Sequence, residues 1–292
     1  MTEITATLVK ALRDRTGAGI MACRTTLSET GGDLDAAIER LRDAQTTMAA
    51  KKADREATEG LVALAVEGRR GAIVEVNCET DFVARGEEFR RAVSSLGAAA
   101  LAVGGHLAAL LSTPSPDGEG SVSDLVTRLT ARTGERVAVR RCALIEAPSG
   151  GMLSPYVHGA VAPGVGVIGV LVALDSAAAP AADIGRRVAM HVAASEPRWL
   201  SEADIPQAIR AETRAELLAQ ARTTGKPDGV VERMVEGRLR KFVDEVVLLR
   251  QPFIIDPDRT VEQALAEASV HTGTPIRVRA FVRFRVGDAV AP

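Results

Sequence analysis

The stretch EVNCETDFVARGEEF sets an acid beside a large aromatic residue, Asp81 and Phe82, where a strand-like run becomes helix-like. An aromatic side chain exposed at such a junction can contact another molecule, and residues at these junctions are often functional. Phe82 also shares a helical spacing with Phe89 and Val93, which predicts a side chain on the first turn of a buried stripe. At the level of sequence both interpretations of Phe82 stay open.

Glycine spacing offers one candidate nucleotide site. No GxxxxGK[ST] phosphate loop occurs, but a GxGxxG spacing does, at Gly164, Gly166 and Gly169. A dinucleotide site needs these glycines to open a helix, whereas here they run into the β-branched segment VLVAL. We therefore predict turn and strand glycines, and no bound cofactor.

Histidines, cysteines and serines show no catalytic or metal-binding spacing. The sequence has no HExxH, no paired Cys/His ligands and no GxSxG serine. His191 lies on the apolar face of a predicted helix, which indicates a hydrogen-bonded core histidine. Cys23, Cys78 and Cys142 are far apart, which argues against a disulfide framework and a zinc site. The sequence predicts a binding protein rather than an enzyme, with no metal.

The stretch IRVRAFVRFRV, residues 276–286, alternates basic and apolar residues. The basic positions are Arg277, Arg279, Arg283 and Arg285, and the apolar positions opposite them are Ile276, Val278, Val282 and Phe284. The basic stripe could follow a phosphate backbone, which makes an RNA-associated scaffold one hypothesis. The solvated outer face of an antiparallel sheet explains the same alternation, because only one face of such a sheet needs to be apolar.

Composition describes an ordinary globular chain. It has 292 residues, of which 46% are hydrophobic and 25% charged, and this length suits two or three compact units. The net charge of −2 provides no field that would recruit nucleic acid or an anionic membrane. The N-terminal MTEITATLVKALRDRTG carries charges where a signal peptide needs an apolar run. We expect a soluble, cytoplasmic protein.

Periodicity predicts an N-terminal helical domain with a linker over residues 1–55. Three short helices fit residues 1–45, with turns at RTGAG and GG and a cap at Asp33 on the third, LDAAIERLRDA. The polar, basic stretch AAKKADREATEG follows as a helical linker or as the edge of the next unit. A unit this small buries little apolar surface, and small bundles of this kind usually present a face to a partner.

The rest of the chain predicts an α+β core of two related halves with antiparallel sheets. In residues 56–146, a β-hairpin around GRRG precedes a helix that starts at Asp81, with Thr80 as its N-cap. Residues 147–292 repeat this pattern loosely, with a hairpin around Pro163-Gly164 and then a helix. Two helices within 204–243 are expected to project as a helical hairpin, since the first has no clean apolar stripe.

EVNCETDFVAR closely resembles the signature of translation elongation factor Ts, the nucleotide-exchange partner of elongation factor Tu. LVKALRDRTGAGIMACRTTLSETGGDLDAAIERLR is similar to the small ubiquitin-associated-like (UBA-like) domain of that family. Further blocks follow in the family's order, namely AAKKADREATEGLV, HVAASEPRWL, GKPDGVVERMVEGRLRKF, QPFIIDP and FVRFRVG. The resemblance spans essentially the whole chain.

The resemblance implies a guanine-nucleotide exchange factor that binds elongation factor Tu and itself binds no nucleotide, metal or membrane. Asp81 and Phe82 would form a wedge beside the GDP site and disturb the magnesium and phosphate elements there. GDP would then leave and GTP would rebind. The positions that match partner-contacting residues of the family are Met21, Arg24, Lys52, Thr80, Val83, His158 and Ile254.

Two further points stay open. In the family, the hairpin at 204–243 is where members can form a homodimer, but its low apolarity here argues against a firm dimer. The alternative function is that of a divergent copy, an RNA- or ribosome-associated binding protein without exchange activity.

Overall fold

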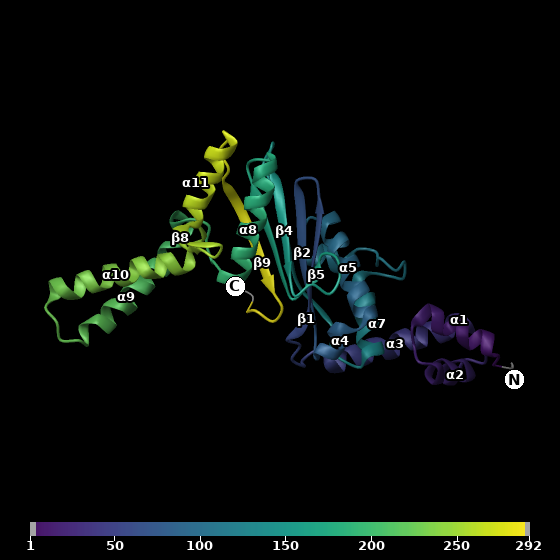
Figure 1. Cartoon of the computed structure of the whole chain (residues 1–292). Coiled ribbons are helices and arrows are strands. Elements are labelled where there is room, and N and C mark those ends of the chain that lie inside the picture. The colour runs from purple at the N-terminus through teal and green to yellow at the C-terminus, as the bar shows by residue number, and fades with distance from the viewer. Residues whose placement is uncertain (1–3, 290–292) are drawn as a thin grey trace.

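The computed structural model describes residues 4–289, and its helices and antiparallel strands form a layered α+β body (Figure 1). The helices are α1 (Ala6–Thr16), α2 (Ile20–Glu29), α3 (Leu34–Lys52), α4 (Asp81–Arg85), α5 (Glu87–Ala102), α6 (Leu107–Ser112), α7 (Val122–Thr133), α8 (Ala179–Ser195), α9 (Gln207–Arg222), α10 (Asp228–Val246) and α11 (Val261–Thr272). The strands are β1 (Glu59–Glu67), β2 (Arg70–Cys78), β3 (Ala138–Glu146), β4 (Met152–His158), β5 (Val165–Gly166), β6 (Ile168–Leu174), β7 (Pro252–Phe253), β8 (Asp256–Thr260) and β9 (Val278–Arg285). Short 3-10 turns lie at Glu202–Asp204 and Leu248–Arg250.

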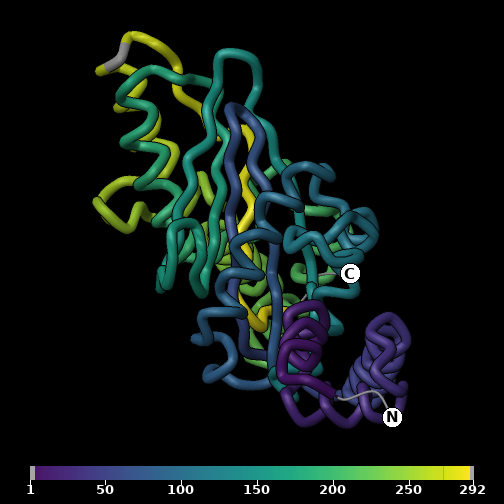
Figure 2. Tube along the Cα trace, turned by 90° about the vertical axis from the view of Figure 1, so that its right-hand side faces the viewer, coloured from purple at the N-terminus to yellow at the C-terminus, as the bar shows by residue number. Residues whose placement is uncertain are grey.

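The first three helices pack around a small core of their own, which includes Leu12, Cys23 and Leu27. Both views show this unit, coloured purple, near the bottom of the molecule, where α3 joins it to α7 (Figures 1 and 2). Helix α3 continues to Lys52, so the first residues of the stretch predicted as a helical linker are indeed helical. Gln45, just beyond the predicted end of this helix, is buried, and its side chain donates a hydrogen bond of 3.0 Å to the Thr16 carbonyl that holds α3 against α1.

Two antiparallel sheets stack face to face in the centre, with strand orders β3-β2-β1-β5 and β4-β6-β9. Between them lie the side chains of Val62, Ile73, Leu171 and Phe284. Helices α5 and α7 cover the outer face of the first sheet, and α8 and α11 cover that of the second. The result is four layers, helix, sheet, sheet and helix (Figure 1).

The predicted hairpin around GRRG is confirmed, since β1 and β2 pair over their full length. The prediction at Pro163-Gly164 is partly wrong. Strands β4 and β6 do pair, but the segment between them includes β5, which pairs with β1 of the other sheet. The Gly164 carbonyl accepts a hydrogen bond of 2.8 Å from the Leu64 amide, which holds this segment on the first sheet.

The GxGxxG glycines lie in turn and strand positions, as predicted. Gly164 has φ of +71° in the turn, and Gly166 and Gly169 lie in β5 and β6. A Cβ atom on Gly169 would come within 2.7 Å of Val62 Cγ1 in the facing sheet. This glycine therefore permits close approach of the two sheets and opens no cofactor-binding helix.

Strand β9 departs from the simple alternation that the sequence predicts. Val278 pairs with Leu174 and Ala280 with Ala173, so Arg279 is an extra residue in a bulge. The extra residue shifts the alternation of side chains by one position, so residues an even number of positions apart across the bulge face opposite sides of the sheet. Val278 consequently packs under α8 and α11, whereas Phe284 packs between the sheets, and the prediction that they share one face is wrong. The face expected to be solvated is also partly closed, because the Arg283 side chain is only 9% exposed.

Helices α9 and α10 pair with one another and extend away from the sheets, at the end of the molecule opposite the N-terminal helices (Figure 1). Their shared apolar cluster consists of Ala221, Val231 and Val235, with Leu217, Leu218 and Leu239 at its edge. Among residues 4–289, no helix is both long enough and apolar enough to cross a membrane.

Candidate functional site

Phe82 lies on α4, a helix of five residues between the end of β2 and the start of α5. Its side chain is 83% exposed. Phe89, seven positions later on α5, is 1% exposed and lies in the core with Val93 and Leu96. The core interpretation is therefore right for Phe89 and wrong for Phe82.

Gly86 separates the two phenylalanines. We predicted one helix starting at Asp81, but Gly86 has φ of −61° and ψ of 138°, an extended conformation that ends α4 and lets α5 begin at Glu87. This break changes the direction of the chain. Phe82 and Phe89 therefore do not share one face of a continuous helix, although their spacing in the sequence is helical. Helix α4 therefore presents Phe82 outward while α5 directs Phe89 inward.

The remaining residues of α4 hold it on the core. Ala84 is buried, and Val83 is half-buried against the same apolar cluster as Phe89. Asp81 pairs with Arg85 at 3.0 Å, in an ion pair that is largely exposed. Thr80 caps the helix as predicted, because its hydroxyl oxygen accepts a hydrogen bond from the Val83 amide.

Glu135, in the turn between α7 and β3, binds the chain immediately before α4. Its Oε2 accepts hydrogen bonds from the backbone amides of Glu79 and Thr80, at 3.1 and 2.9 Å. Its Oε1 accepts a hydrogen bond of 2.6 Å from the Thr80 hydroxyl. Sequence reasoning missed Glu135, which lies 55 positions after Thr80 and belongs to no motif that we considered.

Glu79 and Lys52 bind the same turn from other sides. The Glu79 Oε1 accepts a hydrogen bond of 2.6 Å from the Arg136 amide, which, with nearby Arg55, lowers the pKa of this carboxyl. The Lys52 ammonium at the end of α3 donates a hydrogen bond to the Gly134 carbonyl. Lys52, implied by the resemblance as a partner contact, is thus engaged within the protein.

Other residues implied as partner contacts lie on separate elements. Met21 is 71% exposed near the start of α2, and Arg24 is exposed one turn later. His158 is exposed at the end of β4, and its Nδ1 lies 3.4 Å from the Tyr156 hydroxyl. Ile254 lies exposed in the β7–β8 turn. These residues do not converge on a pocket; they describe a surface spread over several elements.

His191 is buried under the β7–β8 turn and confirms the prediction of a core histidine. Its Nε2 lies 2.9 Å from the Gln251 Oε1, and its Nδ1 accepts a hydrogen bond of 3.2 Å from the Ile254 amide. These contacts describe a neutral ring with the proton on Nε2. Burial lowers the pKa of His191, while the Gln251 hydrogen bond opposes this shift.

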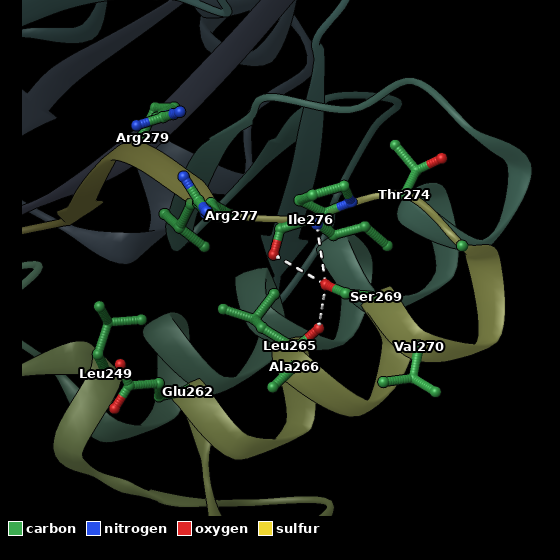
Figure 3. Close-up of a pocket in the computed structure, with 13 residues that line it drawn as sticks. Leu249, Glu262, Leu265, Ala266, Ser269, Val270, Thr274, Ile276, Arg277 and Arg279 are labelled. Carbon is green, nitrogen blue, oxygen red and sulfur yellow. Dashed lines mark hydrogen bonds between the residues drawn. The ribbon is translucent and has the colours of Figure 1, made fainter.

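A cavity of about 660 Å³ lies between α11 and the start of β9 (Figure 3). Leu265, Ile276 and Val278 contribute apolar lining, and Arg277 and Arg279 line the β9 side. Ser269 spans the gap, since it donates to the Leu265 carbonyl and accepts a hydrogen bond of 2.9 Å from the Ile276 amide (Figure 3). No histidine, cysteine or aspartate is among the described residues that line this cavity, and its one carboxylate is that of Glu262.

Metal-binding and thiol chemistry are not evident in the described part of the chain. No group of three or more His, Cys, Asp or Glu side chains within residues 4–289 is placed to hold a metal ion. The three cysteines are free thiols. Cys78, two residues before Thr80, is buried, and desolvation together with nearby Glu135 raises its pKa to about 12. At neutral pH this thiol is therefore protonated and unreactive.

Comparison with known proteins places these features in one family. The family described as elongation factor TS matches residues 79–288. Elongation factor Ts of Parvibaculum lavamentivorans is 47% identical over 292 residues, which cover 99% of this chain and 94% of that protein. The protein of the same name from Rhodospirillum rubrum is 48% identical over 293 residues, again with 99% and 94% covered. The chain belongs to the elongation factor Ts family of translation factors.

Proposed function

We propose that this protein is a guanine-nucleotide exchange factor that binds elongation factor Tu and promotes the release of GDP, so that GTP can rebind during translation elongation. The observation that carries this proposal is Phe82, which stands 83% exposed on a short helix fixed to the core. It lies in the segment that most resembles the family signature. A fixed base and an exposed aromatic tip are what a wedge requires.

Linkage explains how such a wedge would act. An exchange factor must bind the nucleotide-free GTPase more tightly than the GDP-bound form, and the antagonism between GDP and the exchange factor is then reciprocal. Each tenfold loosening of GDP requires about 1.4 kcal/mol of differential binding free energy. Phe82 would supply apolar contact with the partner. Asp81 would be available to contact the partner beside Phe82, because opening its exposed ion pair with Arg85 costs only about 0–1 kcal/mol.

The other implied contacts divide into two groups. Met21, Arg24, His158 and Ile254 are exposed and would bind the partner directly. Thr80, Val83 and Lys52 make internal contacts and would act by holding α4 and its surroundings.

The finer organisation is part of the same proposal. Residues 1–55 would form the ubiquitin-associated-like domain and its linker, with 56–146 and 147–292 as the two halves of the core. The protein would work in the cytoplasm, with no bound nucleotide, metal or membrane of its own. The three helices pack around an apolar core of their own, which supports this division, and exposed Met21 gives that unit an apolar contact for a partner.

The RNA-binding alternative has less support in the geometry. Arg279 pairs with Asp175 at 2.9 Å, and Arg285 pairs with Glu196 at 3.2 Å. Arg283 pairs with Asp288 at 2.9 Å. These carboxylates offset part of the positive charge of the basic stripe, so the stripe offers a phosphate backbone less net charge than its sequence suggests.

The test is the release of a fluorescent GDP analogue from the cognate elongation factor Tu, followed by stopped flow. We expect wild type to accelerate release and Phe82→Ala to do so much less. A matched control is Val270→Ala, because Val270 is another exposed apolar residue, 80% exposed on α11. It should behave as wild type. Failure of the wild-type protein to accelerate release would overturn the proposed function, whereas equal rates for wild type and Phe82→Ala would overturn only the wedge.

A further inference from the structure

The chain before α4 is fixed by one carboxylate from a distant turn. Glu135 accepts three hydrogen bonds from two successive residues, Glu79 and Thr80, at 2.6 to 3.1 Å. The Thr80 hydroxyl that donates to Glu135 also accepts from the Val83 amide as the helix cap. Glu135 therefore orients the capping oxygen of α4 as well as the backbone amides of the two residues before the helix. We propose that Glu135 is a positioning residue for the exchange wedge, and that it sets the direction in which α4 presents Phe82.

Helix α4 depends on such an external support. A helix of five residues is too short to be stable alone, since nucleation is costly and few internal hydrogen bonds follow. Phe82 has no packing of its own to fix it, because most of its surface faces solvent. The direction of Phe82 is thus set by the contacts that hold α4 on the core, which are apolar at Val83 and Ala84 and polar at Thr80.

The turn that carries Glu135 is itself well held. Gly134 ends α7 in the left-handed conformation, with φ of +73°, and the Glu135 amide donates to the Thr133 hydroxyl at 3.2 Å. On the other side, Lys52 from α3 donates to the Gly134 carbonyl. This short turn consequently connects the end of the N-terminal helices with the base of α4. The location of Lys52 at this junction gives it a positioning role alongside Glu135.

This inference rests on the exchange function proposed above, and its test separates rate from affinity. In the stopped-flow assay, Glu135→Ala should lower the maximal rate of GDP release about tenfold, with less than a twofold change in the half-saturating concentration. The reason is that the other partner contacts stay intact while the wedge loses its direction. Glu135→Gln should keep most of the rate, because an amide can still accept from the backbone amides and donate to Thr80. Glu146→Ala serves as control, since Glu146 is an exposed acid on β3 that pairs only with Arg69 among the described contacts.

A double-mutant comparison shows whether Glu135 acts through Phe82. In a Phe82→Ala background, Glu135→Ala should cause no further loss of maximal rate. Additive losses would overturn the positioning role, because they would mean that Glu135 acts independently of the wedge. Equal maximal rates for Glu135→Ala and wild type would overturn it as well.

A measurement on the isolated protein keeps the inference distinct from the exchange function. With a fluorinated phenylalanine at position 82, the 19F resonance should shift or broaden in Glu135→Ala and stay unchanged in Glu146→Ala. If wild type fails to release GDP yet this change occurs, the proposed function is wrong and the support of α4 by Glu135 stands. If the resonance is the same in Glu135→Ala and wild type, Glu135 does not position Phe82.

Discussion

Phe82 and Phe89 show how two identical residues seven positions apart acquire opposite roles. Phe89 is in contact with the core and Phe82 is in contact mainly with solvent. We predict that Phe89→Ala lowers the free energy of unfolding by about 3–5 kcal/mol, as expected for a buried phenylalanine. Phe82→Ala should change it by less than about 0.5 kcal/mol, because surface substitutions seldom matter more. Urea unfolding of both variants checks this, and a large destabilisation by Phe82→Ala would contradict its exposed position.

His191 couples the stability of the protein to pH. Its pKa is lowered by burial, so the folded state binds a proton less readily than the unfolded chain does. The stability contributed by the neutral ring is present above the ordinary pKa of about 6.5 and is lost as pH falls toward the lower folded value. A second proton on Nδ1 would also face the Ile254 amide that now donates to it.

We therefore predict that the free energy of unfolding of wild type falls between pH 7 and pH 5.5. In His191→Gln this decline should be shallower, because the titrating group has been removed. Chemical denaturation at a series of pH values measures both slopes. Parallel slopes for the two proteins would show that His191 does not titrate in this range.

At the scale of these residues, the sequence left Phe82 undecided for a physical reason. The exposure of Phe82 depends on the extended conformation of Gly86. Glycine is compatible with many backbone conformations, so its presence in the sequence does not predict which one it adopts. The role of Glu135 depends on a contact between residues 55 positions apart, which no local pattern encodes. In contrast, the Thr80 cap and the buried His191 follow from local chemistry and were predictable.

At the scale of elements, glycines in two helices should respond oppositely to the same substitution. In α8, a Cβ atom on Gly185 would come within 2.2 Å of Ser154 Oγ in β4, so Gly185→Ala requires the Ser154 side chain or the helix to shift. We predict a loss of about 1–3 kcal/mol in the free energy of unfolding, as for other overpacked sites. Thermal or urea unfolding measures it, and an unchanged stability would mean that α8 does not pack so closely.

Gly237 lies in the middle of α10, where an added Cβ atom would meet no neighbour within 4 Å. Alanine there should stabilise the helix by about 1 kcal/mol, because glycine carries the larger backbone entropy. Hydrogen exchange of the α10 amides should accordingly slow by about fivefold. Faster exchange in Gly237→Ala would contradict an unobstructed helical position.

The sequence predicted elements well where one face of an element is apolar over its whole length. In β2, Ala72, Val74 and Val76 all pack in the core beneath α5, as their alternation indicates. The same reasoning failed at β9, because the bulge at Arg279 exchanges the faces partway along the strand. A bulge is set by the packing of the whole sheet, and the sequence of one strand does not reveal it.

On the scale of the whole molecule, the apolar surface between the sheets joins residues from the two predicted halves of the core. Val62 and Ile73 come from the first half, and Leu171 and Phe284 from the second. Strand β5 adds a direct strand pairing between them. Because this shared surface is buried by both sheets together, neither half should keep its structure when expressed without the other.

The helical hairpin of α9 and α10 has little apolar surface to offer a second copy of the protein. Its apolar residues Ala221, Val231 and Val235 are already buried between its own two helices. A stable homodimer needs apolar surface left over for a second copy, and the outward residues of this hairpin are largely charged or polar. We therefore predict that the protein sediments as a monomer at micromolar concentration. A Leu239→Ala variant should remain monomeric, since Leu239 packs within the hairpin, and should only loosen it. A dimer of the wild-type protein that dissociates in a variant lacking residues 207–246 would contradict this prediction and assign the hairpin to self-association.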